Sequence, residues 1–266
     1  MGKATREAYG NALARIGKEN TNIIVLDADL SKSTKTDTFK AVCPERFFNV
    51  GIAEQNLISV GAGLAAAGKI PFVSSFSMFA TGRAFEQIRN AVCYPKLNVK
   101  VCATHAGITV GEDGATHQSL EDISCMRTLP NMTVVVPADE RETEAVIEWA
   151  ASYNGPVYVR LGRAGVDDVT TEGYSFVPGK STILVDGSDA TIIACGALVG
   201  PAVEASKTLS ESNISARVIN MASIKPIDAE AIIKAAAETG AIVTAEEHNI
   251  IGGLGSAVSE VVVSNK

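Results

Sequence analysis

The segment Asn22–Asp27 reads NIIVLD and is apolar along almost its whole length. A strand with one face in water alternates polar and apolar residues, so this segment is typical of a strand buried on both faces of a parallel sheet. Short apolar runs of the same kind recur at Val99–Ala103, Ala190–Cys195 and Ala241–Ala245, with segments of helical periodicity between them. The pattern predicts an α/β protein built on parallel sheets.

The predicted elements form two groups separated by a polar stretch. Residues 164–180 are polar, rich in Gly and Pro, and without periodicity, which is typical of a linker. We therefore expect two consecutive parallel-sheet α/β domains, at 1–163 and 181–266, and 266 residues are enough for both. The predicted strands are residues 22–27, 47–50, 71–74, 99–103, 133–136 and 157–160 in the first domain and 190–195, 216–220 and 241–245 in the second.

The composition argues against several classes of partner. A formal net charge of −7 and the lack of a basic run argue against binding nucleic acid or an anionic membrane surface. No apolar run is long enough to span a bilayer, and the N-terminal MGKATREAYG has no signal-peptide core. The five cysteines are scattered without a CxxC pair, so we expect reduced, mostly buried thiols of a cytoplasmic protein and no metal site.

A long polar loop, Thr104–Asp122, follows the predicted strand Val99–Ala103 and contains Asp113 and two of the three histidines, His105 and His117. The carboxyl end of a buried strand is where α/β proteins place their chemistry, so this loop is the first candidate site. The simpler interpretation is a solvated loop whose histidines do nothing. The residues alone do not decide between the two.

Glu54 is a second candidate because it begins a segment of small and apolar residues that runs to about Ala67. Such a helix is predicted to be buried, and a buried carboxylate is normally paired or functional. The simpler interpretation is a carboxylate stabilised by the dipole at a helix N-terminus. Phe76 and Phe79 follow the next predicted strand at a spacing of three, which is more often a feature of a core than of a cofactor site.

Three motifs in the first predicted domain point to one family. They are FNVGIAEQN around Glu54, Phe76-Ser-Met-Phe79, and the loop from His105 to His117 with its sequence GEDGATHQ. Together they resemble the C-terminal half of transketolase, a thiamine-diphosphate enzyme, and more specifically the second subunit of a split, prokaryotic-type transketolase. The resemblance covers essentially the whole chain, and the loop is its most specific part. It implies a pyrimidine-binding domain followed by a transketolase C-terminal domain.

The resemblance implies a role for each candidate residue. Glu54 would hydrogen-bond N1′ of the aminopyrimidine of thiamine diphosphate, Phe76 and Phe79 would pack on that ring, and Asp29 would line the cofactor site. Glu54, His105 and His117 are the residues implied in catalysis. The residues implied in binding a sugar phosphate are Arg6, Ser33, His105 and Arg160 at the phosphate, Asp113 at a hydroxyl, and His117 at the terminal hydroxyl and carbonyl of the donor.

The implied reaction is the transfer of a two-carbon ketol unit from a ketose phosphate to an aldose phosphate in the pentose phosphate pathway. No G-D-G…N stretch of the kind that binds diphosphate through a divalent metal is present. We therefore expect an N-terminal-half partner subunit that supplies the Mg²⁺ ligands, in a heterotetramer with two copies of each subunit. The chain ends at Lys266, earlier than the family's second domain usually does, so that domain is expected to be incomplete.

Other interpretations of the same motifs stay open. The family of 1-deoxyxylulose 5-phosphate synthase shares the D-G-x-T-H-Q element but typically carries Arg in place of His105. The β subunit of a 2-oxo acid dehydrogenase shares the G-x-x-E element but lacks the GEDGATHQ loop. A non-catalytic relic is a further alternative, because a fold does not fix a function, although intact Glu54, His105, Asp113 and His117 argue against it.

Overall fold

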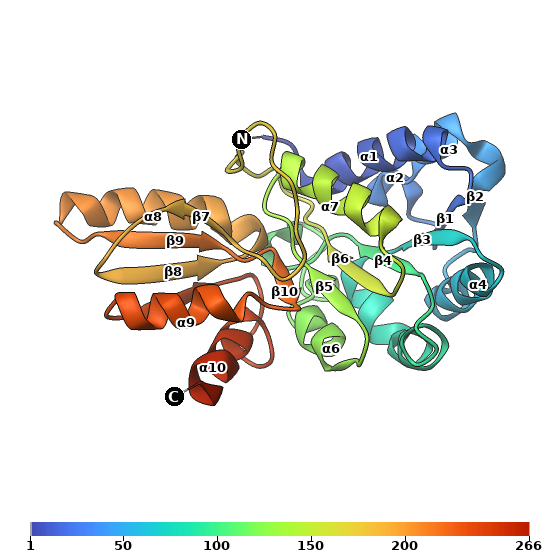
Figure 1. The fold of residues 1–266 in the computed structure, drawn as a ribbon. Coiled ribbons are helices and arrows are strands. Elements are labelled where there is room, and N and C mark those ends of the chain that lie inside the picture. Colours follow the sequence, from blue (N-terminus) through green and yellow to red (C-terminus); the bar gives the residue numbers. More distant parts are fainter. Residues whose placement is uncertain (1, 266) are drawn as a thin grey trace.

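The structure is a computed structural model that describes residues 2–265, and it contains two β-sheets with helices packed on them (Figure 1). The strands are β1 (Ile23–Asp27), β2 (Phe47–Asn49), β3 (Ile70–Ser74), β4 (Lys100–Ala103), β5 (Thr133–Val135), β6 (Val157–Arg160), β7 (Thr182–Val185), β8 (Ala190–Ala194), β9 (Ala216–Asn220), β10 (Ser223–Lys225) and β11 (Ile242–Ala245). The helices are α1 (Thr5–Glu19), α2 (Ser31–Thr34), α3 (Asp37–Val42), α4 (Glu54–Ala66), α5 (Phe85–Gln87), α6 (Asp122–Thr128), α7 (Glu140–Ser152), α8 (Val199–Glu211), α9 (Ala229–Glu238) and α10 (Leu254–Ser264). Shorter turns of 3₁₀-helix are η1 (Pro44–Arg46), η4 (Ile108–Val110) and η5 (Gly196–Leu198), and η2 (Met78–Arg83) and η3 (Ile88–Cys93) are π-helical.

The first sheet has seven strands in the order β10-β5-β6-β4-β3-β1-β2. The strands β1 to β6 pair with one another in parallel, so their carboxyl ends lie at one edge. The seventh strand, β10, comes from the C-terminal part of the chain and pairs antiparallel with β5. The predicted α/β fold with largely parallel sheets is confirmed.

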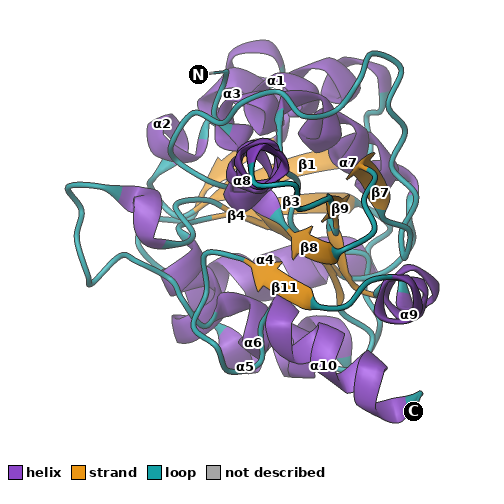
Figure 2. Ribbon diagram, turned by 90° about the vertical axis from the view of Figure 1, so that its left-hand side faces the viewer, coloured by secondary structure: helices purple, strands orange, loops and turns teal. Residues whose placement is uncertain are grey.

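Different helices cover the two faces of the first sheet (Figure 1, Figure 2). On one face, α1, α3 and α7 bury a core that includes Leu13, Phe39 and Ile147. On the other face, α4, η2, η3 and α6 bury a second core, which continues into the second sheet through Ile219 and Leu254. Apolar packing therefore joins the two sheets, in addition to the pairing of β10.

The second sheet has four strands in the order β11-β8-β9-β7. The strands β11, β8 and β9 are parallel, and β7 runs antiparallel along the edge of β9. Helix α8 packs on one face, while α9 and α10 lie on the other (Figure 1). The predictions did not include β7, which is a half-exposed edge strand, or β10, which has three residues.

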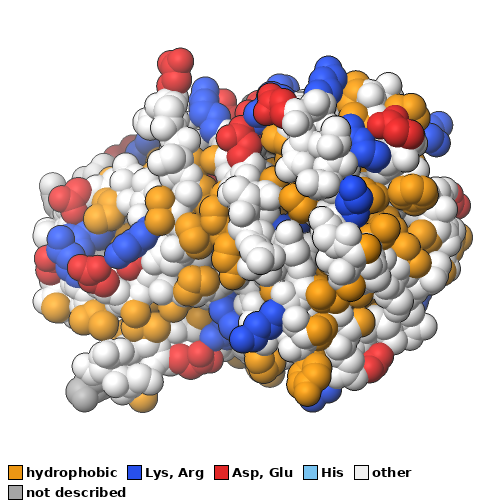
Figure 3. Space-filling view, turned by 45° about the vertical axis from the view of Figure 1, so that its right-hand side comes forward, with side chains coloured by type: hydrophobic (Ala, Val, Ile, Leu, Met, Phe, Trp, Pro, Cys, Tyr) orange, Lys and Arg blue, Asp and Glu red, His pale blue; other side chains and the backbone are white. Residues whose placement is uncertain are grey.

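Charged and apolar side chains are mixed on the surface of the molecule in Figure 3. On the face shown in Figure 3, acidic and basic side chains are interspersed and apolar side chains lie between them, without a continuous basic stripe. Within residues 2–265, no helix has both the length and the apolar character that a membrane crossing requires.

Candidate active site

The predicted site residues follow the carboxyl ends of neighbouring strands in the first sheet. Asp29 follows β1, Glu54 comes after β2, Phe76 after β3 and His105 after β4. Because these strands are parallel and close in the sheet order, the fold gathers the four segments at one edge. An isolated parallel bridge between Phe76 and Thr104 ties the segments after β3 and β4 together.

Glu54 is the first residue of α4 and is almost fully buried, with 1% of its surface exposed. Its Oε1 accepts a hydrogen bond from the Ser75 hydroxyl at 3.1 Å, and its Oε2 is 2.6 Å from Nη1 of Arg83. The Arg83 side chain is half exposed, and its guanidinium carbon lies 4.8 Å from the centre of the Phe79 ring. The carboxylate therefore lies beside an aromatic wall and is paired with a cation that reaches solvent.

Two phenylalanines and two histidines form one aromatic cluster at this edge. The rings of Phe76 and Phe79 stack with their centres 6.0 Å apart. His105 stacks on Phe76 at 3.8 Å, and His117 meets Phe79 edge-on at 5.2 Å. The residues predicted for the cofactor ring and those predicted for the substrate are therefore neighbours in space.

The surroundings of His105 keep its imidazole neutral. Only 2% of its surface is exposed, and the Thr104 hydroxyl lies 2.8 Å from Nδ1. Burial, reinforced by the positive charges of Arg6 and Arg163, lowers the pKa of His105 to about 3. Its backbone has a φ of 59°, a left-handed conformation that is uncommon outside glycine and that occurs at functional sites. A neutral imidazole offers one hydrogen-bond donor and one acceptor.

Arg6 and Ser33 meet at the same edge, through the backbone of Ser33. Nη1 of Arg6 donates a hydrogen bond to the Ser33 carbonyl at 2.8 Å. Nε of Arg6 is buried and has no hydrogen-bond partner within the described residues. Burial, together with the nearby charge of Arg163, lowers the pKa of Arg6. An unpartnered guanidinium nitrogen is a donor available to an anion.

Arg163 brings a second positive charge to this part of the site, although it was not among the predicted residues. It donates hydrogen bonds to the Val110 carbonyl and to the Glu112 carboxylate, and its Nη1 lies 3.9 Å from the carboxylate of Asp113. These contacts join the strand end after β6 to the loop that contains Asp113. The side chain is about a quarter exposed, so it is accessible to a ligand.

Arg160 is not part of this group. Its Nε lies 2.7 Å and its Nη2 3.1 Å from the carboxylate of Asp122, and Nη2 also donates to the carbonyls of Ser119 and Glu247 at 3.2 and 2.7 Å. Burial alone would raise the pKa of Asp122, but the charge and hydrogen bonds of Arg160 outweigh it and lower the pKa. Nε and Nη2 of Arg160 are occupied by buried oxygens of the protein, so this arrangement favours a structural role over the expected phosphate contact. Arg163, not Arg160, lies where the phosphate-binding arginine was expected.

Asp29 lies two residues beyond the end of β1, is exposed, and has a φ of 66°. Its Oδ1 accepts a hydrogen bond from the Asn49 side chain at 2.7 Å. No hydrogen bond among residues 2–265 ties Asp29 to the aromatic cluster, so its place at the cofactor stays a prediction.

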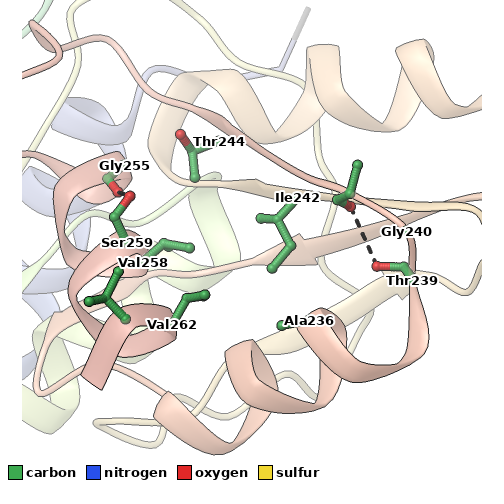
Figure 4. A pocket seen from close by; sticks show the side chains of 11 residues that line it. Ala236, Thr239, Gly240, Ile242, Thr244, Gly255, Val258, Ser259 and Val262 are labelled. Atoms are coloured by element: carbon green, nitrogen blue, oxygen red, sulfur yellow. Dashed lines mark hydrogen bonds between the residues drawn. The ribbon is translucent and has the colours of Figure 1, made fainter. Parts of the chain in front are cut away.

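A hollow of about 400 Å³ lies in the second domain, between β11, α9 and α10 (Figure 4). Its lining consists of apolar and small residues with Thr239, Thr244 and Ser259, and no titratable side chain is among them. This hollow therefore offers no acid–base group for chemistry, unlike the edge of the first sheet. Across the part of the chain that the structure describes, no three His, Cys, Asp or Glu residues are grouped to hold a metal ion.

Comparison with known families assigns both parts of the chain. The family model described as transketolase, pyrimidine binding domain, matches residues 1–167, and that described as transketolase, C-terminal domain, matches residues 179–266. The chain belongs to the transketolase family. The pyrimidine-binding domain thus accounts for β1 to β6, and the transketolase C-terminal domain supplies the second sheet and β10.

Several similar proteins are parts of split transketolases. The putative transketolase C-terminal section of Methanocaldococcus jannaschii is 56% identical over 99% of this chain and 83% of that protein. A subunit of the apulose-4-phosphate transketolase of Phocaeicola vulgatus is 42% identical over 98% of this chain and 84% of that protein. Among solved structures, a split-gene transketolase in an inactive β4 tetramer has a TM-score of 0.93 and 58% identity, over 99% of this chain and 86% of that one.

These matches confirm the recognition made from the motifs. The chain is a homologue of the second subunit of split transketolases, and the transketolase family carries out ketol transfer with thiamine diphosphate. A pyrimidine-binding domain implies thiamine diphosphate as the cofactor, and a second subunit implies a partner that corresponds to the N-terminal half.

Proposed function

We propose that this chain is the subunit of a transketolase that moves a two-carbon ketol unit from a ketose phosphate to an aldose phosphate. The observation that carries the proposal is the convergence of buried Glu54, the pair Phe76 and Phe79, and the two histidines at one sheet edge. The proposal requires a partner subunit, because the chain lacks the G-D-G…N motif that binds diphosphate through Mg²⁺.

The residues around Glu54 fit the pyrimidine end of thiamine diphosphate. The guanidinium of Arg83 is planar, lies over the Phe79 ring and donates a hydrogen bond to Glu54. This space therefore accepts a planar donor between an aromatic ring and a carboxylate, which is what the aminopyrimidine requires. When bound, the cofactor supplies the carbanion chemistry.

The residues of this chain hold the cofactor ring and control its protons. Glu54 holds the proton at N1′, and its burial fixes the carboxylate at one position. Phe76 and Phe79 keep water from that side of the ring, which strengthens the hydrogen bond of Glu54. Arg83 gives up its contact with Glu54 and turns toward the solvent that it already reaches.

The remaining residues form a binding site for a phosphorylated sugar. His117 contacts the terminal hydroxyl and carbonyl oxygens of the donor, Asp113 contacts a further hydroxyl, and neutral His105 keeps its predicted place at the phosphate. Arg6 and Arg163 bind the phosphate, and the unpartnered Nε of Arg6 supports this role. Arg163 thereby replaces Arg160 in the predicted set, while Ser33 keeps its predicted place beside Arg6.

A first experiment tests the need for a partner. The purified chain is expected neither to bind thiamine diphosphate tightly nor to turn over ketose phosphate, and a partner with the G-D-G…N motif should restore both in a complex with two copies of each subunit. The inactive β4 tetramer of the split-gene relative supports this expectation. Micromolar, magnesium-dependent cofactor binding by the lone chain, measured by calorimetry, would contradict it.

A second experiment tests Glu54 in the assembled enzyme. Glu54→Gln keeps the size of the side chain but removes the transferable proton, so exchange of the C2 proton of the cofactor should slow by about 10² to 10⁴. The KM for substrate should change far less. If Glu54 only stabilises the start of α4, the variant will melt at a lower temperature and exchange the C2 proton at the parent rate.

A further inference from the structure

We propose that Glu247 of the C-terminal domain is a positioning residue for the loop Thr104–Asp122, and that this domain acts in the reaction through that contact. The inference rests on the proposed function, because the loop contains His105, Asp113 and His117. It gives the second domain a role in the chemistry although none of the predicted catalytic residues belongs to it.

The carboxylate of Glu247 accepts two hydrogen bonds from one residue of the loop, Thr109. Oε1 of Glu247 accepts a hydrogen bond from the backbone N–H of Thr109 at 3.0 Å, and Oε2 accepts one from the Thr109 hydroxyl at 3.2 Å. Thr109 is the middle residue of η4, a 3₁₀ turn inside the loop. A carboxylate that accepts an N–H of this kind makes a charge-assisted bond, which is stronger than a bond between neutral groups.

The loop is shaped to receive this side chain. Glu247 is 7% exposed, although Thr109 itself is exposed. A Cβ added at Gly107 would lie 2.7 Å from the carboxyl carbon of Glu247, so the glycine leaves the space that the carboxylate fills. Gly107 also has a φ of 85°, which a side chain rarely adopts.

The other contacts of the loop do not replace this one. At its base, the Gly107 N–H donates to the Ser119 carbonyl at 3.0 Å, and the Gln118 side chain donates to the Ile108 carbonyl at 3.0 Å. Both bonds stay inside the loop and close it on itself. Arg163 donates to the carbonyl of Val110, but the proposed role of Arg163 is to bind phosphate. η4 is therefore held by one side chain from the first domain, Arg163, and by one from the second domain, Glu247, and Glu247 is the contact that fixes it to the second domain.

Docking of the two domains does not depend on the Glu247 side chain. Arg160 bonds to the backbone carbonyl of Glu247, which any substitution retains. The Asn249 side chain donates to the Leu120 carbonyl at 2.6 Å, and β10 pairs with β5. A change of the carboxylate should therefore release the loop and leave the domains in place.

The experiment compares Glu247→Ala with Glu246→Ala in the complex with the partner subunit. Glu246 is the adjacent carboxylate, and it accepts the N–H groups of Leu254 and Gly255 at the start of α10, so its loss affects the second domain alone. With Glu247→Ala, amide hydrogen exchange in residues 104–122 should accelerate about tenfold. The kcat/KM for a ketose phosphate should fall about 10- to 100-fold, since misplacing a binding loop by about 1 Å has effects of that size. Glu246→Ala should change neither.

Two further variants separate positioning from folding. Glu247→Gln keeps an oxygen for the Thr109 N–H and should recover most of the loss in kcat/KM. Gly107→Ala should also slow the enzyme. In the Glu247→Ala background this effect should be smaller, because the clash with the carboxyl group is removed while the 2.8 Å approach to Cβ of residue 247 remains.

Three outcomes would overturn the inference: unchanged exchange in Glu247→Ala, the same acceleration in Glu246→Ala, or no recovery with Gln. If the parent complex shows no ketol transfer, the proposed function fails. The exchange measurement still tests whether Glu247 holds the loop in place.

Discussion

Arg160 and Arg163 lie three residues apart at the end of one strand, yet they belong to two different regions. Arg160 is 6% exposed and is paired with Asp122, which is fully buried. Arg163 is 26% exposed, and its partners are Glu112, 81% exposed, and Asp113, 35% exposed. Both members of the first pair belong to the first domain, and we name them the buried ion pair; we name the second group the exposed rim.

The difference shows how burial assigns a role to a charge. A buried guanidinium repays its desolvation only if carboxylate and carbonyl oxygens occupy its donors, as they do at Nε and Nη2 of Arg160, so these donors are not open to a ligand. An exposed ion pair contributes little to stability, so its arginine can leave a carboxylate and bind a phosphate at little cost in free energy. The same residue type is therefore part of the framework in one region and part of a binding site in the other.

The largest expected effect comes from breaking the buried ion pair. Arg160→Ala leaves the charge of Asp122 buried without compensation and should lower the free energy of unfolding by about 3–5 kcal/mol. Chemical denaturation of the purified chain measures this. The matched double variant Arg160→Met with Asp122→Asn removes both charges and should recover most of the loss.

Removing the cation of the exposed rim should leave stability nearly unchanged and weaken substrate binding. In the assembled enzyme, Arg163→Ala removes a charge-assisted contact worth about 1.5–3 kcal/mol, so the KM for phosphorylated donors should rise about 10- to 100-fold. An unphosphorylated donor, measured in parallel, should show almost no change. If Arg163→Ala unfolds the chain and leaves the KM intact, the comparison between the two regions is wrong.

Acid should destabilise the chain through His105. Its folded-state pKa, about 3, lies below the ordinary value of 6.5, so between these pH values the unfolded chain binds more protons than the folded one. The stability that His105 contributes is therefore complete above pH 6.5 and declines as the pH falls toward 3, by at most about 1.4 kcal/mol per pH unit. Denaturation of the parent and of His105→Phe over this range measures the difference, and equal slopes for both would exclude a neutral buried His105.

The smallest effect should come from Glu112, the exposed partner of Arg163. Glu112→Gln should change the free energy of unfolding by less than about 1 kcal/mol, because exposed ion pairs contribute little. It also frees Arg163, so the KM for a phosphorylated donor should fall a few-fold at low salt. A rise in that KM would mean that Glu112 holds Arg163 in the position for binding.

The sequence predicted those parts of the site that depend on local pattern. Glu54 at the start of a helix, the spacing of Phe76 and Phe79, and the loop from His105 to His117 are each contained in one short segment. The helix itself, α4, is not buried as predicted: Glu54, Leu57, Ile58, Gly61 and Ala62 are buried, whereas the opposite face is exposed, because small residues suit a surface helix as well as a buried one. The family comparisons confirm the recognition that rests on these segments.

The parts that sequence could not predict depend on partners far along the chain. Arg160 is separated by 38 positions from Asp122 and by 87 from Glu247. The residues around Arg160 and Arg163 do not indicate which of the two arginines is buried. Arg83 reaches Glu54 from the end of a π-helical segment, which a search for helical periods of 3.6 residues does not detect. The strand β10 has three residues, and its pairing with β5 joins two domains that the sequence presents as consecutive.

The place of β10 also bears on how the chain is made. The ribosome synthesises β5 about ninety residues before β10, so for several seconds at ordinary elongation rates the nascent first domain has an open strand edge. During that interval a neighbouring nascent chain can pair with β5 instead. Chaperones that bind nascent chains should therefore associate with this protein until Lys225 has emerged from the exit tunnel, and a fragment that stops at residue 163 should aggregate when it is expressed alone.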